Sequence, residues 1–87
     1  MALDDLISSK GKLKILKLLF KVGQANISYI ARETHLNHSL VEKHLEDLVK
    51  AGIVVERRYG RMRIFMVDMK NPRVSGLSEI LRQLENL

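Results

Sequence analysis

The side chains of this sequence that are best suited to bind a ligand are two runs of positive charge. Each run is free of acidic residues: the first comprises Lys10, Lys12, Lys14, Lys17 and Lys21, and the second comprises Arg57, Arg58, Arg61 and Arg63. Guanidinium groups present several donors in a planar fork that matches phosphate oxygens. The pattern therefore predicts a polyanion as partner, although the lysine run alone is equally typical of a solvated helix surface.

Residues for enzyme chemistry or for a cofactor do not form a recognisable pattern. The sequence has no cysteine, which excludes disulfides, thiolate metal ligands and cysteine catalysis. It contains no glycine-rich phosphate loop and no nucleophile beside a base, and the adjacent Asp4 and Asp5 are typical solvated acids at a helix start. We therefore predict neither an enzyme nor a cofactor-binding protein.

Three histidines raise the question of a metal site. His35 falls in a predicted turn, whereas His38 and His44 lie six residues apart on one predicted helix and so point in different directions. No second group of His, Asp or Glu with ligand spacing follows near the C-terminus. We predict no metal site, and we interpret His35 as a turn residue, His38 as a contact to the polyanion and His44 as a helix-surface residue.

Length and composition indicate one ordinary globular domain. The chain has 87 residues, of which 46% are hydrophobic and 29% charged, and its formal net charge is +5. This length suffices for a single modest core. No apolar run approaches the roughly 20 residues that a membrane-spanning helix needs, and the acidic N-terminus has no apolar signal core. We expect a cytoplasmic, nucleoid-associated protein without a membrane partner.

Helical periodicity predicts four helices in the first part of the chain. The segments with this spacing are a short one that starts near residue 3 and ends near 8–11, then about 12–22, 27–34 and about 38–51. Gly23 stops the second of them, and the polar stretch 24–26 is either a turn or a single bridge of strand. Asn37 is a good N-cap for the fourth helix, which ends at Gly52.

Two apolar runs in the second part predict a β-hairpin. They are Ile53–Val55 and Ile64–Val67, and Gly60 between them supplies the positive φ that a tight turn needs. Beyond Asn71–Pro72, an apolar stripe with heptad-like spacing predicts a C-terminal helix over about 72–87. The stripe consists of Val74, Leu77, Ile80, Leu81, Leu84 and Leu87.

Two short helices joined by a turn and followed by a hairpin have the order of a winged helix-turn-helix. We therefore predict an α+β domain, mainly α, over residues 1–87, with a core at about 10–68, a β-hairpin wing and a C-terminal dimerisation helix. In this fold the second helix of the motif lies in the major groove of DNA, with its N-terminal residues at base edges. The hairpin reaches over the phosphate backbone, where arginines supply charge and several donors.

Several blocks of residues have the types and spacing of a known family. They are Lys14–Leu16, Ile30–Ala31, Leu36–Leu48, Ala51–Val54 and the hairpin Arg57–Phe65. Together these blocks resemble the core of ArsR-type and related winged-helix transcription regulators over about residues 10–75, and the ending Asn71–Val74 is similar to archaeal members. By position, the resemblance implies core residues at Leu36, Val41, Leu45 and Leu48. It also implies base and phosphate contacts from His38, Ser39, Leu40, Glu42 and Lys43, to which we add the capping residue Asn37.

Two residues of this set depart from the family pattern. Leu40 stands where Thr or Ser is frequent, so it offers an apolar contact, for example to a thymine methyl group, in place of a hydrogen bond. Glu42 would face either a phosphate, which is unfavourable, or a cytosine amino group. Glu42 therefore indicates either selection of sequence or weak, selective binding.

The hairpin and the lysine run complete the predicted DNA-binding surface. The wing contacts are Arg57, Arg58, Tyr59, Gly60, Arg61 and Arg63, and the additional phosphate contacts are Lys10, Lys12 and Lys14. An alternative is that the arginines only solubilise the edge of a hairpin. Tyr59 either stacks on or hydrogen-bonds the DNA backbone, or it is a plain turn aromatic.

The C-terminal stripe either folds back onto its own domain or pairs with a second copy. Because so small a core leaves little surface to cover the stripe, we predict a homodimer with terminal segments at its interface. The interface residues are Leu3, Leu6, Ile7, Val74, Leu77, Ile80, Leu81, Leu84 and Leu87. Two-fold symmetry then places two recognition helices about 34 Å apart on a palindromic site.

The predicted function is sequence-specific binding of double-stranded DNA by a homodimeric transcription regulator whose effector the sequence does not specify. One alternative is a sequence-tolerant protein that coats DNA. Another is a winged helix that serves as a protein-interaction module, because a fold does not fix a function.

Overall fold

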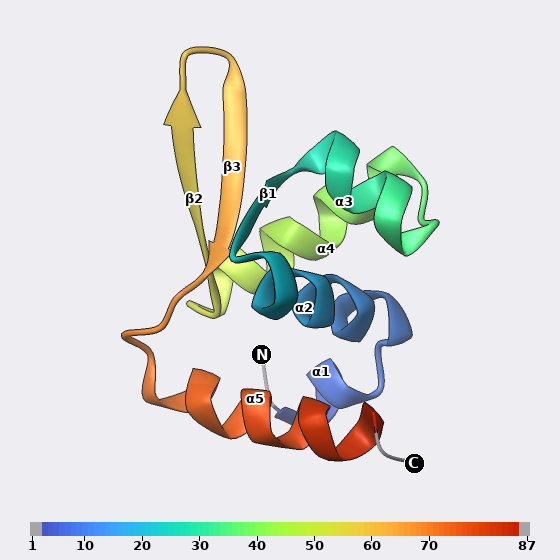
Figure 1. Cartoon of the computed structure of the whole chain (residues 1–87), viewed down its shortest axis with the longest axis vertical. Helices are drawn as coiled ribbons and strands as arrows, with labels where there is room; N and C mark the ends of the chain where they lie inside the picture. The colour runs from blue at the N-terminus through green and yellow to red at the C-terminus, as the bar shows by residue number, and fades with distance from the viewer. Residues whose placement is uncertain (1–2, 86–87) are drawn as a thin grey trace.

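The computed structural model describes residues 3–85, and over this range the chain forms five helices and three strands (Figure 1). In chain order the elements are α1 (Leu3–Ile7), α2 (Lys10–Val22), β1 (Gln24–Asn26), α3 (Ile27–Thr34), α4 (His38–Lys50), β2 (Val54–Tyr59), β3 (Met62–Val67) and α5 (Pro72–Glu85). This is the predicted order of a mainly helical winged helix-turn-helix, with α3 and α4 as the motif and β2–β3 as the wing.

Side-chain caps decide where helices begin. Oγ of Ser9 accepts a hydrogen bond from the backbone N–H of Lys12 at 3.2 Å, so α2 starts two residues earlier than predicted. Oδ1 of Asn37 accepts from the backbone N–H of Leu40 at 2.8 Å, which confirms the predicted cap of α4. Asn26 caps α3 in the same way. Each cap satisfies one of the donors that the first turn of a helix leaves unpaired.

The end of α4 is a fixed turn that leads straight into the wing. The backbone N–H of Gly52 donates to the carbonyl of Val49, and that of Ile53 donates to the carbonyl of Leu48, both at 3.0 Å. This pair of hydrogen bonds requires a residue in the left-handed conformation after the helix, and Gly52 supplies it with a φ of 75°. The wing is therefore joined to α4 without a flexible linker.

The sheet is antiparallel, with strand order β1-β3-β2. Strands β2 and β3 pair from Val54↔Val67 to Tyr59↔Met62, and Gly60, with a φ of 63°, makes the tight turn that was predicted. The stretch 24–26, for which the sequence left two possibilities, is a strand that pairs with β3, with Ala25 opposite Phe65. It ties the base of the wing to the helical body.

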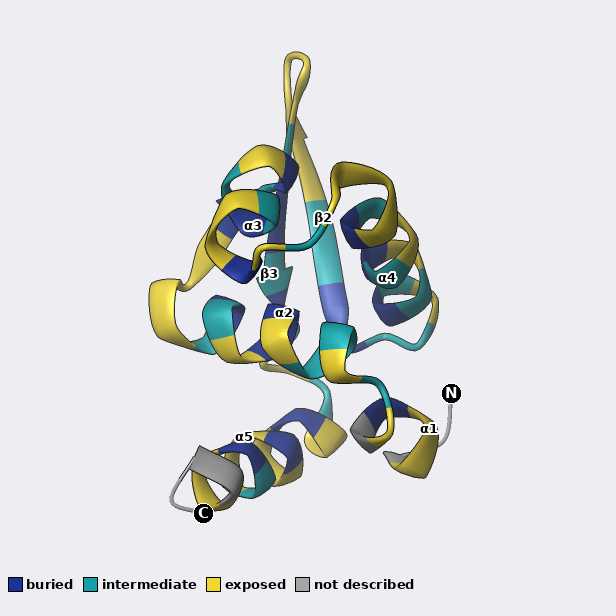
Figure 2. Ribbon diagram, turned by 90° about the vertical axis from the view of Figure 1, so that its right-hand side faces the viewer, coloured by how far each residue is buried: buried dark blue, intermediate teal, exposed yellow. Residues whose placement is uncertain are grey.

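A single buried cluster holds the helices and the sheet together (Figure 2). Helix α2 contributes Ile15, Leu16 and Leu19, and α4 contributes the predicted core residues Val41, Leu45 and Leu48. Phe65 of β3, which is 1% exposed, enters this cluster from the sheet. The apolar face of α4 is thus fully used by the core, and only its polar face and its first turn remain accessible.

The C-terminal stripe is covered by the chain itself, so the expectation that it lacks an intrachain partner is wrong. Val74, Leu77 and Leu81 are buried in the common cluster, as is Leu6 of α1. The physical reason is that α2 packs against α1 and α5 as well as against α3, α4 and β3, and so offers more surface than its sequence pattern indicates. Ile80 is partly buried. Leu87 lies outside the described residues, as do the side chains of Leu3, Ile7 and Leu84.

Candidate nucleic-acid interface

The helix-turn-helix presents the first turn of α4 to solvent. His35 ends α3 in the left-handed conformation, with a φ of 60°, and so reverses the chain between the two helices. His38, Ser39 and Leu40, the first three residues of α4, are exposed, and 38% of the apolar Leu40 is accessible. An exposed leucine at this position is available for contact with another molecule rather than for the core.

The wing carries its positive charge beyond the helical body. In Figure 1 the β2–β3 hairpin projects past α3 and α4, and its residues 57–62 are exposed. Residues directly opposite in an antiparallel pair share a face of the sheet. The register therefore places Arg58 and Arg63 on one face, and Tyr59 with Met62 on the other, where they are 61% and 52% exposed. All predicted wing contacts except the partly buried Arg63 are accessible.

Arg63 is engaged by two carboxylates of its own chain. Its Nε lies 2.8 Å from Oε2 of Glu56 and its Nη2 lies 3.3 Å from Oε1 of the same residue, a two-point contact. Its Nη1 lies 3.3 Å from Oε2 of Glu42, on α4. Arg58 also reaches Glu56, at 3.1 Å. The sequence left Glu42 facing a phosphate or a cytosine; in the structure its partner is the guanidinium of Arg63.

The ion-pair network shifts the pKa values of two of its members. The hydrogen bond from Arg63 is the main reason that the pKa of Glu56 lies below its ordinary value, and burial opposes this shift. The hydrogen bond to Glu56 in turn raises the pKa of Arg63. Both shifts favour the charged forms, so the network persists at neutral pH.

The predicted phosphate-contacting lysines divide into two kinds. Lys10 and Lys14 are exposed. The side chain of Lys12 is only 16% exposed, and its Nζ lies 3.1 Å from Oδ2 of Asp47 on α4. Lys43 binds the other oxygen of Asp47 at 3.1 Å, although its own side chain remains 63% exposed. Lys12 therefore joins α2 to α4, a role that sequence spacing did not indicate.

His44 is not the simple surface residue that was predicted. Its ring is partly buried against α2, and its Nδ1 has no hydrogen-bond partner within the described residues. Burial lowers the pKa of His44, and the charge of Lys12 lowers it further. No signal in the sequence indicated this contact, because Gly11, which faces the ring of His44, lies before the predicted start of the helix at about residue 12.

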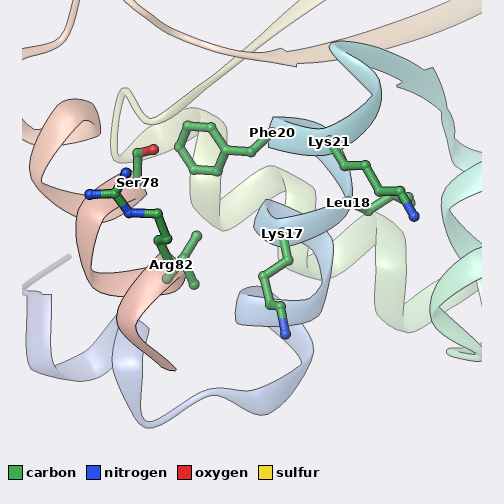
Figure 3. A pocket seen from close by; sticks show the side chains of 7 residues that line it. Lys17, Leu18, Phe20, Lys21, Ser78 and Arg82 are labelled. Atoms are coloured by element: carbon green, nitrogen blue, oxygen red, sulfur yellow. The ribbon is translucent and has the colours of Figure 1, made fainter. Parts of the chain in front are cut away.

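The hollows that flank the helices include one beside the wing and one beside α5. One, of about 330 Å³, lies between α4 and the wing and is lined by Asn26, Ile27, Ser28, His38, Glu42, Arg61, Met62 and Arg63. The other, of about 590 Å³, lies between α2 and α5 and is lined by Lys17, Leu18, Phe20, Lys21, Ser78, Leu81 and Arg82 (Figure 3). Figure 3 shows Phe20 reaching from α2 toward α5. In Figure 1, α5 lies on the far side of α2 from the wing, so the hollow between α2 and α5 takes no part in the surface formed by α4 and the hairpin.

Within residues 3–85, no group of three or more His, Asp or Glu side chains is arranged to hold a metal ion. Over the same described range, no helix is long and apolar enough to cross a membrane.

Fold and exposed surface together define the class of this protein as a winged helix-turn-helix. The model of a family described as "Bacterial regulatory protein, arsR family" matches residues 9–55, more than half of the chain, and the chain belongs to this family. It is accordingly a DNA-binding transcription regulator and not an enzyme, and its macromolecular partner is double-stranded DNA.

Solved structures agree with this fold. The antimony-specific transcriptional repressor AntR is 19% identical with a TM-score of 0.80, over 95% of this chain and 74% of that chain. A homodimeric winged helix-turn-helix domain from Mycobacterium bovis is 23% identical with a TM-score of 0.76, over 95% and 74%. The repressor PagR of Bacillus anthracis is 25% identical with a TM-score of 0.73, over 92% and 85%. No curated protein sequence matches the chain.

Proposed function

We propose that this protein binds a specific site on double-stranded DNA as a homodimer, with α4 in the major groove and the wing on the adjacent phosphate backbone. The observation that carries this proposal is that α4 and the wing tip flank one hollow, which His38 and Glu42 line from one side and Arg61 and Met62 from the other. In Figures 1 and 2 the wing projects, and α4 lies, on the side of α2 that faces away from α5. A helix and a hairpin so placed suit a groove and the backbone beside it.

The exposed side chains on this side supply two kinds of contact. His38, Ser39 and Leu40 meet base edges, where Leu40 offers an apolar surface to a thymine methyl group. Arg57 and Arg61 are exposed and form no ion pair within the part of the chain that the structure describes, so they bind phosphates.

Further phosphate contacts come from the lysines of α2. Lys10 and Lys14 are exposed and keep this proposed role. Lys12 no longer has this proposed role, because its ammonium group is held by Asp47 in a largely buried contact.

The proposed dimer rests on the homodimeric structure of the Mycobacterium bovis domain and on the position of the terminal helices. We place the interface on α1 and α5, which lie on the side opposite the wing and leave the DNA-facing surface free. Because Leu6, Val74, Leu77 and Leu81 are buried within one chain, the outward faces of these helices make the contact, together with the partly buried Ile80. A regulator of this kind acts in the cytoplasm, on the nucleoid.

Selection from random duplex oligonucleotides tests this proposal. A recovered palindrome, with half-sites about one helical turn apart, supports a sequence-specific dimer. Binding without a consensus supports a protein that coats DNA. Absence of binding to any duplex at about 150 mM salt favours a protein-interaction module. Analytical ultracentrifugation of the free protein checks the dimer separately, and a monomer at micromolar concentration would contradict it.

A further inference from the structure

One side chain connects the tip of the wing to the recognition helix. The pairing of β1 with β3 stops at Ile64, so the hairpin beyond this residue is held only by pairing between β2 and β3. Arg63 is the first residue of this outer part, and its guanidinium reaches Glu42 on α4 at 3.3 Å. The same group binds Glu56 on β2 and lies over the ring of Phe65, 5.3 Å from its centroid.

We propose that Arg63 is a positioning residue, which fixes the wing relative to α4 through Glu42 and Glu56, and that it is not a phosphate contact. The inference rests on the proposed function, because it concerns how the two DNA-binding elements are held together. Arg57 and Arg61 bind the DNA backbone in this arrangement, and Arg63 sets where they stand.

The geometry of the contact supports a positioning role. A guanidinium that meets one carboxylate through two N–H groups has its direction fixed, whereas a single contact would leave the side chain free to turn. The side chain of Arg63 is 27% exposed and that of Glu56 is 21% exposed, so water screens this pair less than it screens the contact from the 69% exposed Arg58.

The charges around Arg63 argue against a phosphate contact. Its positive charge faces the carboxylates of both Glu42 and Glu56, and Arg58 also pairs with Glu56, so the four groups together are neutral. A phosphate brought to this place would therefore gain no net attraction from this cluster. DNA binding therefore depends on Arg63 through the separation of α4 and the wing, which must match the separation of groove and backbone.

Arg63→Lys separates the two roles, because it keeps the charge and removes the planar fork. We expect the ratio of affinities for the selected site and for random duplex to fall by about fivefold, the effect of one lost structural contact. The dependence of affinity on salt stays as in the unchanged protein. A phosphate contact would give a different result. Arg63→Lys would then keep the affinity ratio, and Arg63→Gln would lower the slope of log affinity against log salt by about 0.9. These two results together would overturn the proposal.

Glu42→Gln tests the link from the other side and guards against a folding defect, since the side chain of Glu42 is 44% exposed. We expect the same loss of affinity ratio with an unchanged consensus. A change of the preferred base at one position would instead show that Glu42 reads DNA.

A distance measurement reports the position of the wing directly. The chain has no cysteine, so spin labels at Glu46→Cys on α4 and Met62→Cys on the wing are unique, and both native side chains are exposed. We expect the distance distribution to broaden when Arg63→Lys or Glu42→Gln is added, and to stay unchanged with the control Lys70→Gln, which lies outside both elements. Identical distributions would contradict the inference.

Selection of DNA sites distinguishes failure of this inference from failure of the proposed function. If the unchanged protein selects no site, the proposed function fails. If it selects a site for which Arg63→Lys keeps the full affinity ratio, only this inference fails.

Discussion

The imidazole ring of His44, on α4, lies against Gly11, on α2, so closely that a Cβ added to Gly11 would stand 2.5 Å from Nε2 of His44. The recognition helix therefore rests on α2 at a point where no side chain separates the two. The neighbouring ion pair from Lys12 to Asp47 connects the same two helices. Together these contacts set how α4 is held on the domain.

Replacement of Gly11 by alanine should displace the ring of His44 and disturb the packing of α4 on α2. The added methyl group clashes with the ring of His44, a kind of overpacking that costs about 1–3 kcal/mol, and this outweighs the roughly 1 kcal/mol that alanine contributes inside a helix. We expect a lower free energy of unfolding in urea. Gly76→Ala is the matched control: nothing lies within 4 Å of its added Cβ, so it should raise stability by up to about 1 kcal/mol. Equal effects of the two substitutions would show that the contact with His44 is soft.

The stability of the domain should fall on mild acidification. The pKa of His44 is lowered in the folded chain, chiefly by burial and then by Lys12, so the unfolded chain binds a proton more readily. The contribution of the neutral ring is complete above the ordinary histidine pKa of about 6.5 and is lost as the pH falls from there through the lower folded value. The carboxylates of Asp47 and Glu56, whose pKa values are also lowered, titrate at more acidic pH and leave this window clear.

Urea unfolding between about pH 8 and about pH 5.5 measures this dependence. His44→Gln, which stays neutral throughout, should flatten the curve. His38→Gln, which removes an exposed histidine of the same helix, is the control for the substitution itself. A pH dependence that survives in His44→Gln would place its source elsewhere.

Substitution of two neighbouring lysines of α2 should affect different properties: Lys12 the stability of the domain, and Lys10 its affinity for DNA. Lys12→Gln breaks the largely buried pair with Asp47 and should lower the free energy of unfolding by about 1 kcal/mol, with little effect on the salt dependence of DNA binding. Lys10→Gln, at an exposed position, should leave stability within about 0.5 kcal/mol and weaken binding to all sequences. The assignment fails if Lys12→Gln is the variant that changes the salt slope.

The double substitution of Arg57 and Arg61 by alanine should weaken binding to every duplex. Each lost phosphate contact lowers the slope of log affinity against log salt by about 0.9, while the preference among sequences persists. Fluorescence anisotropy with labelled duplexes at several salt concentrations measures both quantities. Lys70→Ala, an exposed cation in the connection between β3 and α5, is the control and should change neither. An unaltered slope in the double variant would remove the wing from the DNA-binding surface.

Local signals in the sequence were sufficient for most of the secondary structure. Asn37 caps α4 because its side chain reaches a backbone amide three residues away, and Gly60 makes the hairpin turn because only the local backbone has to bend. Helical periodicity likewise predicted α4, in which Val41, Leu45 and Leu48 are buried. These signals depend on residues close together in the chain, so they can be recognised in the sequence without knowledge of the fold.

Contacts between distant residues were decided only by the tertiary structure. The three polar residues of β1 become a strand because the edge of β3 is there to pair with them. The C-terminal stripe is buried because α2 packs against α5 as well as against the rest of the core, and the number of apolar positions in the sequence does not reveal this contact. The two runs of positive charge were legible in the sequence, but Glu42 and Arg63 are 21 residues apart. Whether an arginine faces DNA or a carboxylate of its own chain depends on how helix and wing pack, and spacing along the chain carries no record of that packing.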